Sequence, residues 1–311
     1  MPDFSNRASW GFLFVAISAI IFGTIGVATK GVFHVSETNA LSITLWRALI
    51  ALPALLGIGL LVLRGKLFSI QRRDLRLMIF AGLLMAMYQA AFVVAVQAVN
   101  VTIATLVTLC TVPVWAALVS GIVLRERLHR NIFFAMGCAI VGVVLLVGLQ
   151  PIENLGTNVA LGISMALLTA VSSASFQVCG RVLSKNYHPL QSLTIFSIVA
   201  TLALLPVTLF NGFQINYPPV GWLLLAHLGI GISVVAYIFL LLGLERTPAT
   251  IATIIGLLEP LTGTILAVII FNEQLGATGL FGAMLLLAAM VLVWRTNVRV
   301  VTCHHAPRVS R

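Results

Sequence analysis

The chain has 311 residues, of which 60% are hydrophobic and 8% are charged, and its formal net charge is +10. Soluble domains carry about a quarter charged residues, so this composition excludes an ordinary water-soluble domain and predicts a polytopic membrane protein. The basic residues are not interleaved with aromatic ones. Their excess therefore predicts membrane topology and contact with the lipid bilayer, and no nucleic-acid partner.

Ten apolar runs follow one another along the chain, and each suits a bilayer-spanning helix of about 20 residues. We predict these runs at 10–32, 39–63, 76–97, 100–123, 131–149, 157–181, 190–210, 219–243, 247–270 and 277–295. The breaks at Asn100 and at Glu245 are the least marked. At the first of them, only "AVN" separates the third run from the fourth. A backbone in lipid must satisfy its own hydrogen bonds, so all ten runs are expected to be α-helices. The first run is too long for a secretory signal and is predicted to be a retained helix.

The lysines and arginines predict which helix ends face the cytoplasm. With a cytoplasmic N-terminus, 16 of the 18 basic residues fall on the inner side, and the other two, Lys30 and Arg47, lie within spans. We therefore expect a multi-pass protein of the inner (cytoplasmic) membrane with both termini in the cytoplasm. Residues 298–311 are predicted to form a basic cytoplasmic tail.

Cysteine and histidine positions indicate neither a disulfide nor a metal site. Cys110, Cys138 and Cys179 fall within predicted helices, no pair has CxxC spacing, and "CHH" at 303–305 lacks a fourth ligand. HExxH and GxSxG motifs are also absent from the sequence. We expect no metal, no cofactor and no enzyme activity, with an intramembrane enzyme as a remote alternative.

The second half of the chain repeats the pattern of the first. "TIATLVTLCTVPVWAALVSGIVLRERL" (102–128) aligns with "ATIATIIGLLEPLTGTILAVIIFNEQL" (249–275), which pairs Pro113 with Pro260 at a separation of 147 residues. A weaker match between the first and sixth spans gives the pairs Gly11 with Gly162 and Lys30 with Arg181. We predict two copies of a five-helix unit, residues 1–150 and 151–297. Because five is odd, the copies must cross the membrane in opposite senses, an arrangement typical of secondary transporters.

Several of these segments resemble one known family. "RERL" and "NEQL" at helix ends, "LLEPLTGTILA" and "LWRALIALP" look like EamA-type members of the drug/metabolite transporter superfamily, over about 10–295. Within that group, the length and "TVPVWAALVSGIVLRERL" look most like YddG-type exporters of aromatic amino acids. The resemblance implies an all-α fold of ten helices in two inverted repeats, a central cavity made by helices 1, 3, 4, 6, 8 and 9, and efflux from the cytoplasm. The first copy has Val112 where the second has Glu259, so this carboxylate is not shared.

Polar side chains are costly in lipid, so those inside the spans are expected to face a cavity or another helix. The fourth span presents Thr108, Thr111 and Trp115 on one face, and the sixth presents Ser173 and Gln177 on another. Helix packing is the alternative for these residues, although an indole near mid-span suits an aromatic ligand. The predicted substrate-binding residues are Lys30, Tyr88, Gln89, Thr108, Thr111, Trp115, Ser173, Gln177 and Tyr237.

Charged residues within the spans have more than one interpretation. Lys30 could neutralise a substrate carboxylate or extend to the outer head groups. Glu259, beside Pro260, is a candidate for proton coupling or for binding a substrate ammonium, or is protonated and bonded to a carbonyl freed by the proline. Arg47 is interpreted as a structural anchor rather than a substrate contact, and His227 as a hydrogen-bonded packing residue.

These patterns favour a carrier that moves small metabolites between the two repeats by alternating access. A channel is the next alternative, but no filter or pore ring is evident. Only two cations lie within spans, so a small neutral or zwitterionic substrate with an apolar body fits better than a polyanion, and amino acids, aromatic or neutral, are the first choice. Another small metabolite or drug, such as a purine, a nucleoside or a sugar-like compound, is the alternative. The sequence does not distinguish proton coupling from facilitated diffusion. It also predicts no oligomeric state, and a monomer is one option.

Overall fold

Helices make up all the regular structure of residues 4–99, 101–124, 130–147, 158–271 and 277–303, which a computed structural model describes. The elements are α1 (Phe4–Val35), α2 (Ala40–Leu63), α3 (Arg72–Ala98), α4 (Val101–Val123), α5 (Arg130–Val147), α6 (Val159–Leu183), α7 (Pro189–Phe210), α8 (Pro219–Ala226), the π-helix η2 (His227–Ala236), α9 (Tyr237–Arg246), α10 (Ala249–Gly256), α11 (Leu258–Phe271) and α12 (Ala277–Cys303).

Eight helical segments in the described ranges are long and apolar enough to cross a membrane. One of them runs continuously through α8, η2 and α9, from Pro219 to Arg246, and another joins α10 to α11. Two shorter apolar helices, Ile132–Leu146 and Ala277–Leu292, lie where the fifth and tenth spans are predicted. The prediction of an all-helical, multi-pass membrane protein is confirmed.

Some helix bounds differ from the predicted spans. α1 begins at Phe4 rather than at residue 10, and α12 continues to Cys303, so residues 298–303 of the predicted tail are helical. α3 ends at Ala98 and α4 begins at Val101, while the predicted break at Asn100 lies outside the described residues. A helix that leaves the apolar layer keeps its internal hydrogen bonds, so hydropathy alone does not locate its end.

Short polar side chains and glycine mark several helix ends. Asn39 begins α2 and Asn158 begins α6, and each side-chain oxygen accepts a hydrogen bond from the third following backbone N–H, at 2.7 and 3.1 Å. α2 ends where Arg64 and Gly65 adopt positive φ angles of 44° and 83°. These local signals divide the apolar chain into separate helices.

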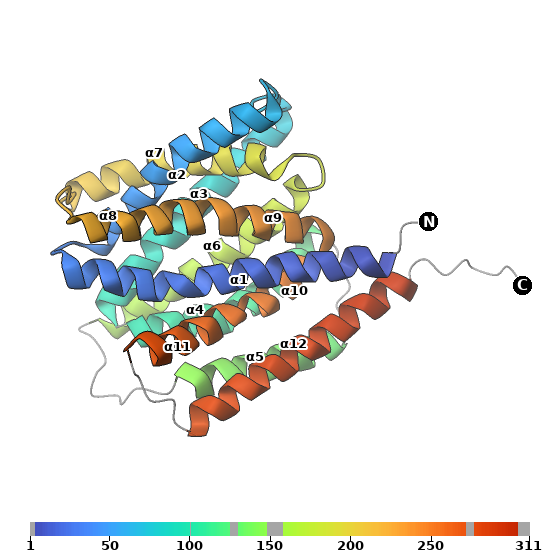
Figure 1. Ribbon diagram of the computed structural model, residues 1–311. Coiled ribbons are helices and arrows are strands. Elements are labelled where there is room, and N and C mark those ends of the chain that lie inside the picture. Colours follow the sequence, from blue (N-terminus) through green and yellow to red (C-terminus); the bar gives the residue numbers. More distant parts are fainter. Residues whose placement is uncertain (1–3, 100, 125–129, 148–157, 272–276, 304–311) are drawn as a thin grey trace, which may run out of the picture.

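The helices lie side by side, and their contacts fall into matching pairs (Figure 1). α1 packs along α9 and α11, and α6 packs along α3 and α4. α2 packs against α7, and α5 packs against α12. The described ends of α1 and α12 that carry the chain termini lie at the same end of the bundle (Figure 1).

Glycines at the helix crossings establish which residues correspond in the two halves. At Gly82 of α3 an added Cβ would lie 2.7 Å from Val199 of α7, and at Gly229 of η2 it would lie 2.7 Å from Ile50 of α2. Real Cβ atoms do not approach this closely, so both crossings require glycine. The two corresponding crossings are therefore built in the same way.

The same two crossings relate Arg47 to Phe196. Gly82 lies beside the carbonyl oxygen of Phe196, and Gly229 lies beside that of Arg47. Arg47 of α2 and Phe196 of α7 therefore occupy corresponding positions in the two halves. This correspondence places a cation on one side of the molecule where the other side has a phenyl ring.

Hydrogen bonds also join the halves outside the membrane-spanning segments. At one end the hydroxyls of Thr38 and Tyr217 lie 2.6 Å apart, and at the other the Tyr187 hydroxyl donates to the Asp74 carboxylate at 2.6 Å. The hydrogen bond to Asp74 raises the pKa of Tyr187, and burial raises the pKa of Tyr217. Both phenols therefore stay protonated at neutral pH.

Candidate functional site

Two tyrosines from opposite halves meet at the centre of the bundle. The hydroxyls of Tyr88 (α3) and Tyr237 (α9) are hydrogen-bonded to each other, and Tyr237 is only 5% exposed. Each tyrosine lies roughly 15 Å from the C-terminal end of its helix at about 1.5 Å per residue. The pair therefore lies near the middle of the apolar layer.

Three phenylalanines surround the tyrosine pair. The Phe22 ring of α1 packs edge-on against Tyr237 at 5.0 Å, and the Phe176 ring of α6 lies 6.0 Å from both tyrosine rings. Phe196 of α7 packs edge-on against Phe176 at 5.4 Å. Edge-to-face contacts of this kind stabilise ring pairs beyond the area they bury. Together these five rings form the central aromatic cluster.

A cation and a carboxylate lie near this cluster. The charge of Arg47 (α2) interacts electrostatically with the Glu259 carboxyl and with the hydroxyls of both Tyr88 and Tyr237. Arg47 is half-buried, and its Nε atom is buried without a hydrogen-bond partner among the described residues. Such an atom is costly to leave unpaired. The Nε atom of Arg47 could therefore donate to an acceptor that the described residues do not provide.

Glu259 lies just after a break in its helical segment. α10 ends at Gly256, and α11 begins at Leu258, with Glu259 in its first turn beside Pro260. α4 instead continues unbroken through Pro113. The N-terminus of a helix has a positive partial charge, which favours a carboxylate there. The break therefore provides a position for an acidic group that the first half does not provide.

The predicted residues on α4 make hydrogen bonds typical of helix packing. The Thr108 hydroxyl donates to the Ala166 carbonyl of α6 at 3.3 Å, and Thr111 donates to the Val107 carbonyl of its own helix at 2.6 Å. Trp115 lies on the same helix face and is half-buried. The face of α4 towards α6 thus carries Thr108 and Thr111, which are bonded to helix carbonyls, and Trp115, which is partly accessible.

The remaining predicted residues lie on the helices around the cluster. Gln89 of α3 and Ser173 and Gln177 of α6 are half-buried, on the two helices that carry Tyr88 and Phe176. Lys30 of α1 is exposed and lies two turns beyond Phe22. The structure thus brings together Tyr88, Tyr237, Arg47 and Glu259, with the others arranged around them.

His227 is hydrogen-bonded, as predicted. The Thr24 hydroxyl donates its proton to the Ile21 carbonyl at 2.7 Å and lies 3.0 Å from Nε2 of His227. This bond ties the beginning of η2 to α1.

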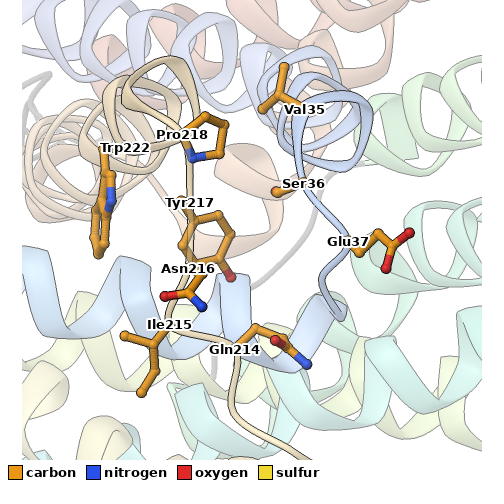
Figure 2. A pocket seen from close by; sticks show the side chains of 9 residues that line it. All are labelled: Val35, Ser36, Glu37, Gln214, Ile215, Asn216, Tyr217, Pro218 and Trp222. Atoms are coloured by element: carbon orange, nitrogen blue, oxygen red, sulfur yellow. The ribbon is translucent and has the colours of Figure 1, made fainter.

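A pocket of about 500 Å³ lies away from the cluster, between the α1–α2 and α7–α8 connections. Figure 2 shows its lining, which includes Glu37, Gln214, Asn216, Tyr217 and Trp222. The Glu37 carboxylate points away from Tyr217 in this view (Figure 2). This pocket is distinct from the central cavity that the family resemblance implies.

Sequence reasoning missed the three phenylalanines of the cluster. Phe22 and Phe176 carry no polar group, so they look like any other apolar residue of a membrane span. Phe176 lies on the same side of α6 as Ser173, one turn away, which is the signal that could have identified it. Phe196 had no such signal, because its role depends on how α7 packs.

Comparisons with known proteins point to one family. The sequence model of the EamA-like transporter family matches residues 9–148 and 160–295. The uncharacterized transporter YwfM of Bacillus subtilis is 25% identical over 281 residues, which cover 90% of this chain and 92% of that protein. An uncharacterized transporter of Archaeoglobus fulgidus is 26% identical over 288 residues, covering 92% and 97% of the two chains.

Two further comparisons concern an exporter and a solved structure. The pseudopaline exporter CntI of Pseudomonas aeruginosa is 22% identical over 237 residues, which cover 76% of this chain and 81% of the exporter. The chain of one crystal structure matches with a TM-score of 0.80 at 17% identity, covering 94% of this chain and 99% of that chain. This last likeness shows a shared fold.

Proposed function

The chain belongs to the EamA-like transporter family, and on that premise we propose that it exports neutral and aromatic amino acids from the cytoplasm by alternating access. The observation that carries the proposal is the division of the centre into an apolar aromatic side and a charged side. A zwitterion with an apolar body needs both.

The apolar side and the charged side occupy corresponding positions in the two halves. Arg47 corresponds to Phe196 through the glycine crossings, and Glu259 corresponds to Val112 through the aligned prolines. Phe196 and Val112 are both buried. Each repeat thus contributes one charged and one apolar residue, and the two sides of the tyrosine pair differ in polarity. This difference supports an asymmetric substrate bound between them.

Each group of the substrate has a proposed partner. Glu259 binds the ammonium group, and Arg47 binds the carboxylate, because each is the complementary charge near the cluster. Tyr88, Tyr237 and Phe176 contact the apolar body. This proposal departs from the interpretation of Arg47 as an anchor, since its buried Nε needs an acceptor that a substrate carboxylate would supply.

The packing supports two inverted repeats that rock around the tyrosine pair. The contacts of α6 with α3 and α4 have counterparts in those of α1 with α9 and α11, while α2–α7 and α5–α12 each pair corresponding helices. Gly11 lies against the end of α9 and Gly162 against the end of α3, as their alignment implies. Repeats of this kind are suited to alternating access around a fixed site.

The membrane topology is part of the same proposal. The described termini share one end of the bundle (Figure 1), and the basic connections Arg64–Arg76 and Arg181–Lys185 follow helices that end on the proposed inner side. We place the protein in the inner membrane with both termini in the cytoplasm. Its partners are the lipid bilayer and a small substrate.

A second candidate is export of another small metabolite. One relative is named a pseudopaline exporter, and this name is the observation that favours the second candidate. The charged side of the centre would still bind a zwitterionic part of such a compound. The two candidates differ in the body that the aromatic side must accept.

Counterflow in liposomes tests the proposed function. Purified protein in vesicles preloaded with unlabelled phenylalanine is expected to accumulate labelled phenylalanine in a saturable way. Unlabelled neutral amino acids should compete, whereas glucose phosphate should not. If no amino acid gives saturable counterflow and a purine, nucleoside or other metabolite does, the result would favour the second candidate.

Replacing Trp115 by Ala tests the substrate class. We expect counterflow of phenylalanine to fall about tenfold more than that of alanine, because an indole stacks on an aromatic substrate and not on a methyl group. The matched control is Trp222→Ala, which removes an indole at the α7–α8 end. An equal loss for both substrates would assign Trp115 to helix packing.

A further inference from the structure

The interior face of α1 is covered at one end and accessible at the other. Val15 and Ala19 are 1% and 2% exposed. Gly26 and Lys30 follow on the same face, seven and eleven residues beyond Ala19, and both are exposed. A Cβ added at Gly26 would have no neighbour within 4 Å. The change occurs at Phe22, whose ring packs on Tyr237.

The corresponding end of α6 is closed. Arg181, which aligns with Lys30, is half-buried, and its Nη1 donates to the Leu244 carbonyl at 2.9 Å and also to the Thr247 carbonyl. These carbonyls belong to the C-terminal end of α9 and the residue after it, where a helix leaves acceptors without intrahelical donors and favours a cation. The guanidinium therefore joins α6 to α9.

Close packing accompanies these hydrogen bonds. A Cβ added at Gly180 would lie 3.1 Å from Leu241 and 3.3 Å from Leu244. α6 thus packs on α9 at this end. Among the described residues, α1 and α3, the corresponding pair of the other half, have no comparably extensive contact. The halves differ here in exposure, since Arg181 is half-buried and Lys30 is exposed.

We propose that Arg181 is the latch that holds the cytoplasmic end closed, so that the structure represents the outward-facing state of the carrier. The proposal rests on the proposed carrier function and adds the residue that controls which side is open. In the opposite state Arg181 leaves the end of α9, and Lys30 donates to the carbonyls at the end of α3. A guanidinium can donate to two carbonyls at once with a preorganised fork, whereas an ammonium is a compact, strongly hydrated charge on a flexible stem whose donors are not preorganised. The latch of the inner end is therefore the stronger, and the outward-facing state is favoured.

Two reporter cysteines measure the balance between the states. In a background with Cys110, Cys138, Cys179 and Cys303 replaced by Ala, Gly26→Cys reports on the outer end. Gln177→Cys, at the aligned position of α6, reports on the inner end. Each is labelled with a membrane-impermeant maleimide, from outside in right-side-out vesicles and from the cytoplasmic side in inside-out vesicles. No substrate is needed, so the result is independent of the counterflow assay.

Removing the latch is expected to shift both reporters. Arg181→Ala should slow labelling at Gly26→Cys and speed labelling at Gln177→Cys, so that the ratio of the two rates changes about tenfold, which is the size of one hydrogen bond to a charged group. Lys30→Ala should have the opposite effect. Lys185→Ala, an exposed cation at the same end of α6, is the matched control and should leave both rates unchanged.

A second variant tests the latch in case Arg181→Ala does not fold. Gly180→Val inserts methyl groups between α6 and α9 without removing a charge, and it should shift the reporters in the same direction as Arg181→Ala. Arg181→Lys should give an intermediate shift. Unchanged rates in folded Arg181→Ala, or in Gly180→Val if the former does not fold, would assign Arg181 to helix capping alone. Shifted reporters without amino-acid counterflow would overturn the proposed substrate and leave the latch standing.

Discussion

We expect the replacement of Glu259 by Gln to abolish the acceleration of transport by a pH gradient that proton coupling through this carboxyl predicts. The carboxylate lies in the first turn of α11, and its charge interacts with that of Arg47 and with the hydroxyls of Tyr88 and Tyr237, which come from α2, α3 and α9. A proton that binds Glu259 changes the balance of charge between the two repeats, whereas the glutamine amide cannot bind one. Gradient-driven uptake should fall at least tenfold, to its level without a gradient.

The same substitution separates coupling from substrate binding. If Glu259 also binds the ammonium group, the KM of counterflow should rise about tenfold at unchanged maximal rate, because one charge-assisted hydrogen bond is weakened. Glu245→Gln, at the exposed end of α9, is the control and should change neither quantity. A pH-gradient response that persists in Glu259→Gln would end the coupling proposal.

Replacing Tyr237 by Ala should reduce counterflow about a hundredfold. The side chain contacts Phe22 and Phe176 and is bonded to Tyr88, so its removal opens a cavity where the two repeats meet. Deleting a buried aromatic ring costs about 3–5 kcal/mol of folding free energy, so transport is normalised to folded protein measured by thermal unfolding. Tyr237→Phe keeps the ring and loses the hydroxyl, and it should retain most of the rate.

Tyr217→Ala provides the matched control for Tyr237→Ala. Tyr217 is also a buried tyrosine bonded to a hydroxyl of the other half, but it lies at the α7–α8 end, away from the central cluster. Its removal should lower the unfolding temperature and leave the counterflow per folded molecule nearly unchanged. Equal losses in both variants would mean that Tyr237 acts through packing.

The helices and the pairing of the two halves could be predicted, because the sequence signals for them are local or repeated along the chain. Small residues at steps of four on α6 predict a packing face, and Ala166, Ala170 and Ala174 are fully buried. The aligned pair Gly11 and Gly162 was equally visible, since each glycine permits a close helix contact in its own half.

The tyrosine pair could not be derived from the repeat alignment. Gly82 and Gly229 correspond at a separation of 147 residues, but the bonded Tyr88 and Tyr237 are 149 residues apart. The π-helix η2 includes Gly229 and ends at Ala236, directly before Tyr237, and the described residues of α3 have no counterpart of it. A π-helix has more residues per turn than an α-helix, so η2 accommodates the additional residues and brings Tyr237 opposite Tyr88.

By itself the sequence determined that this chain crosses a membrane many times and that its two halves are related. It also determined where the apolar part of each helix begins. These properties follow from composition, periodicity and repetition, which act within one segment or between aligned segments. Only the tertiary structure decided the setting of Arg47. The sequence pattern predicts a position towards the head groups, and the structure adds that the charge of Arg47 interacts with the Glu259 carboxyl and with the hydroxyls of Tyr88 and Tyr237. The physical reason is that the free energy of a charge in lipid depends on its neighbours from other helices, which no single segment specifies.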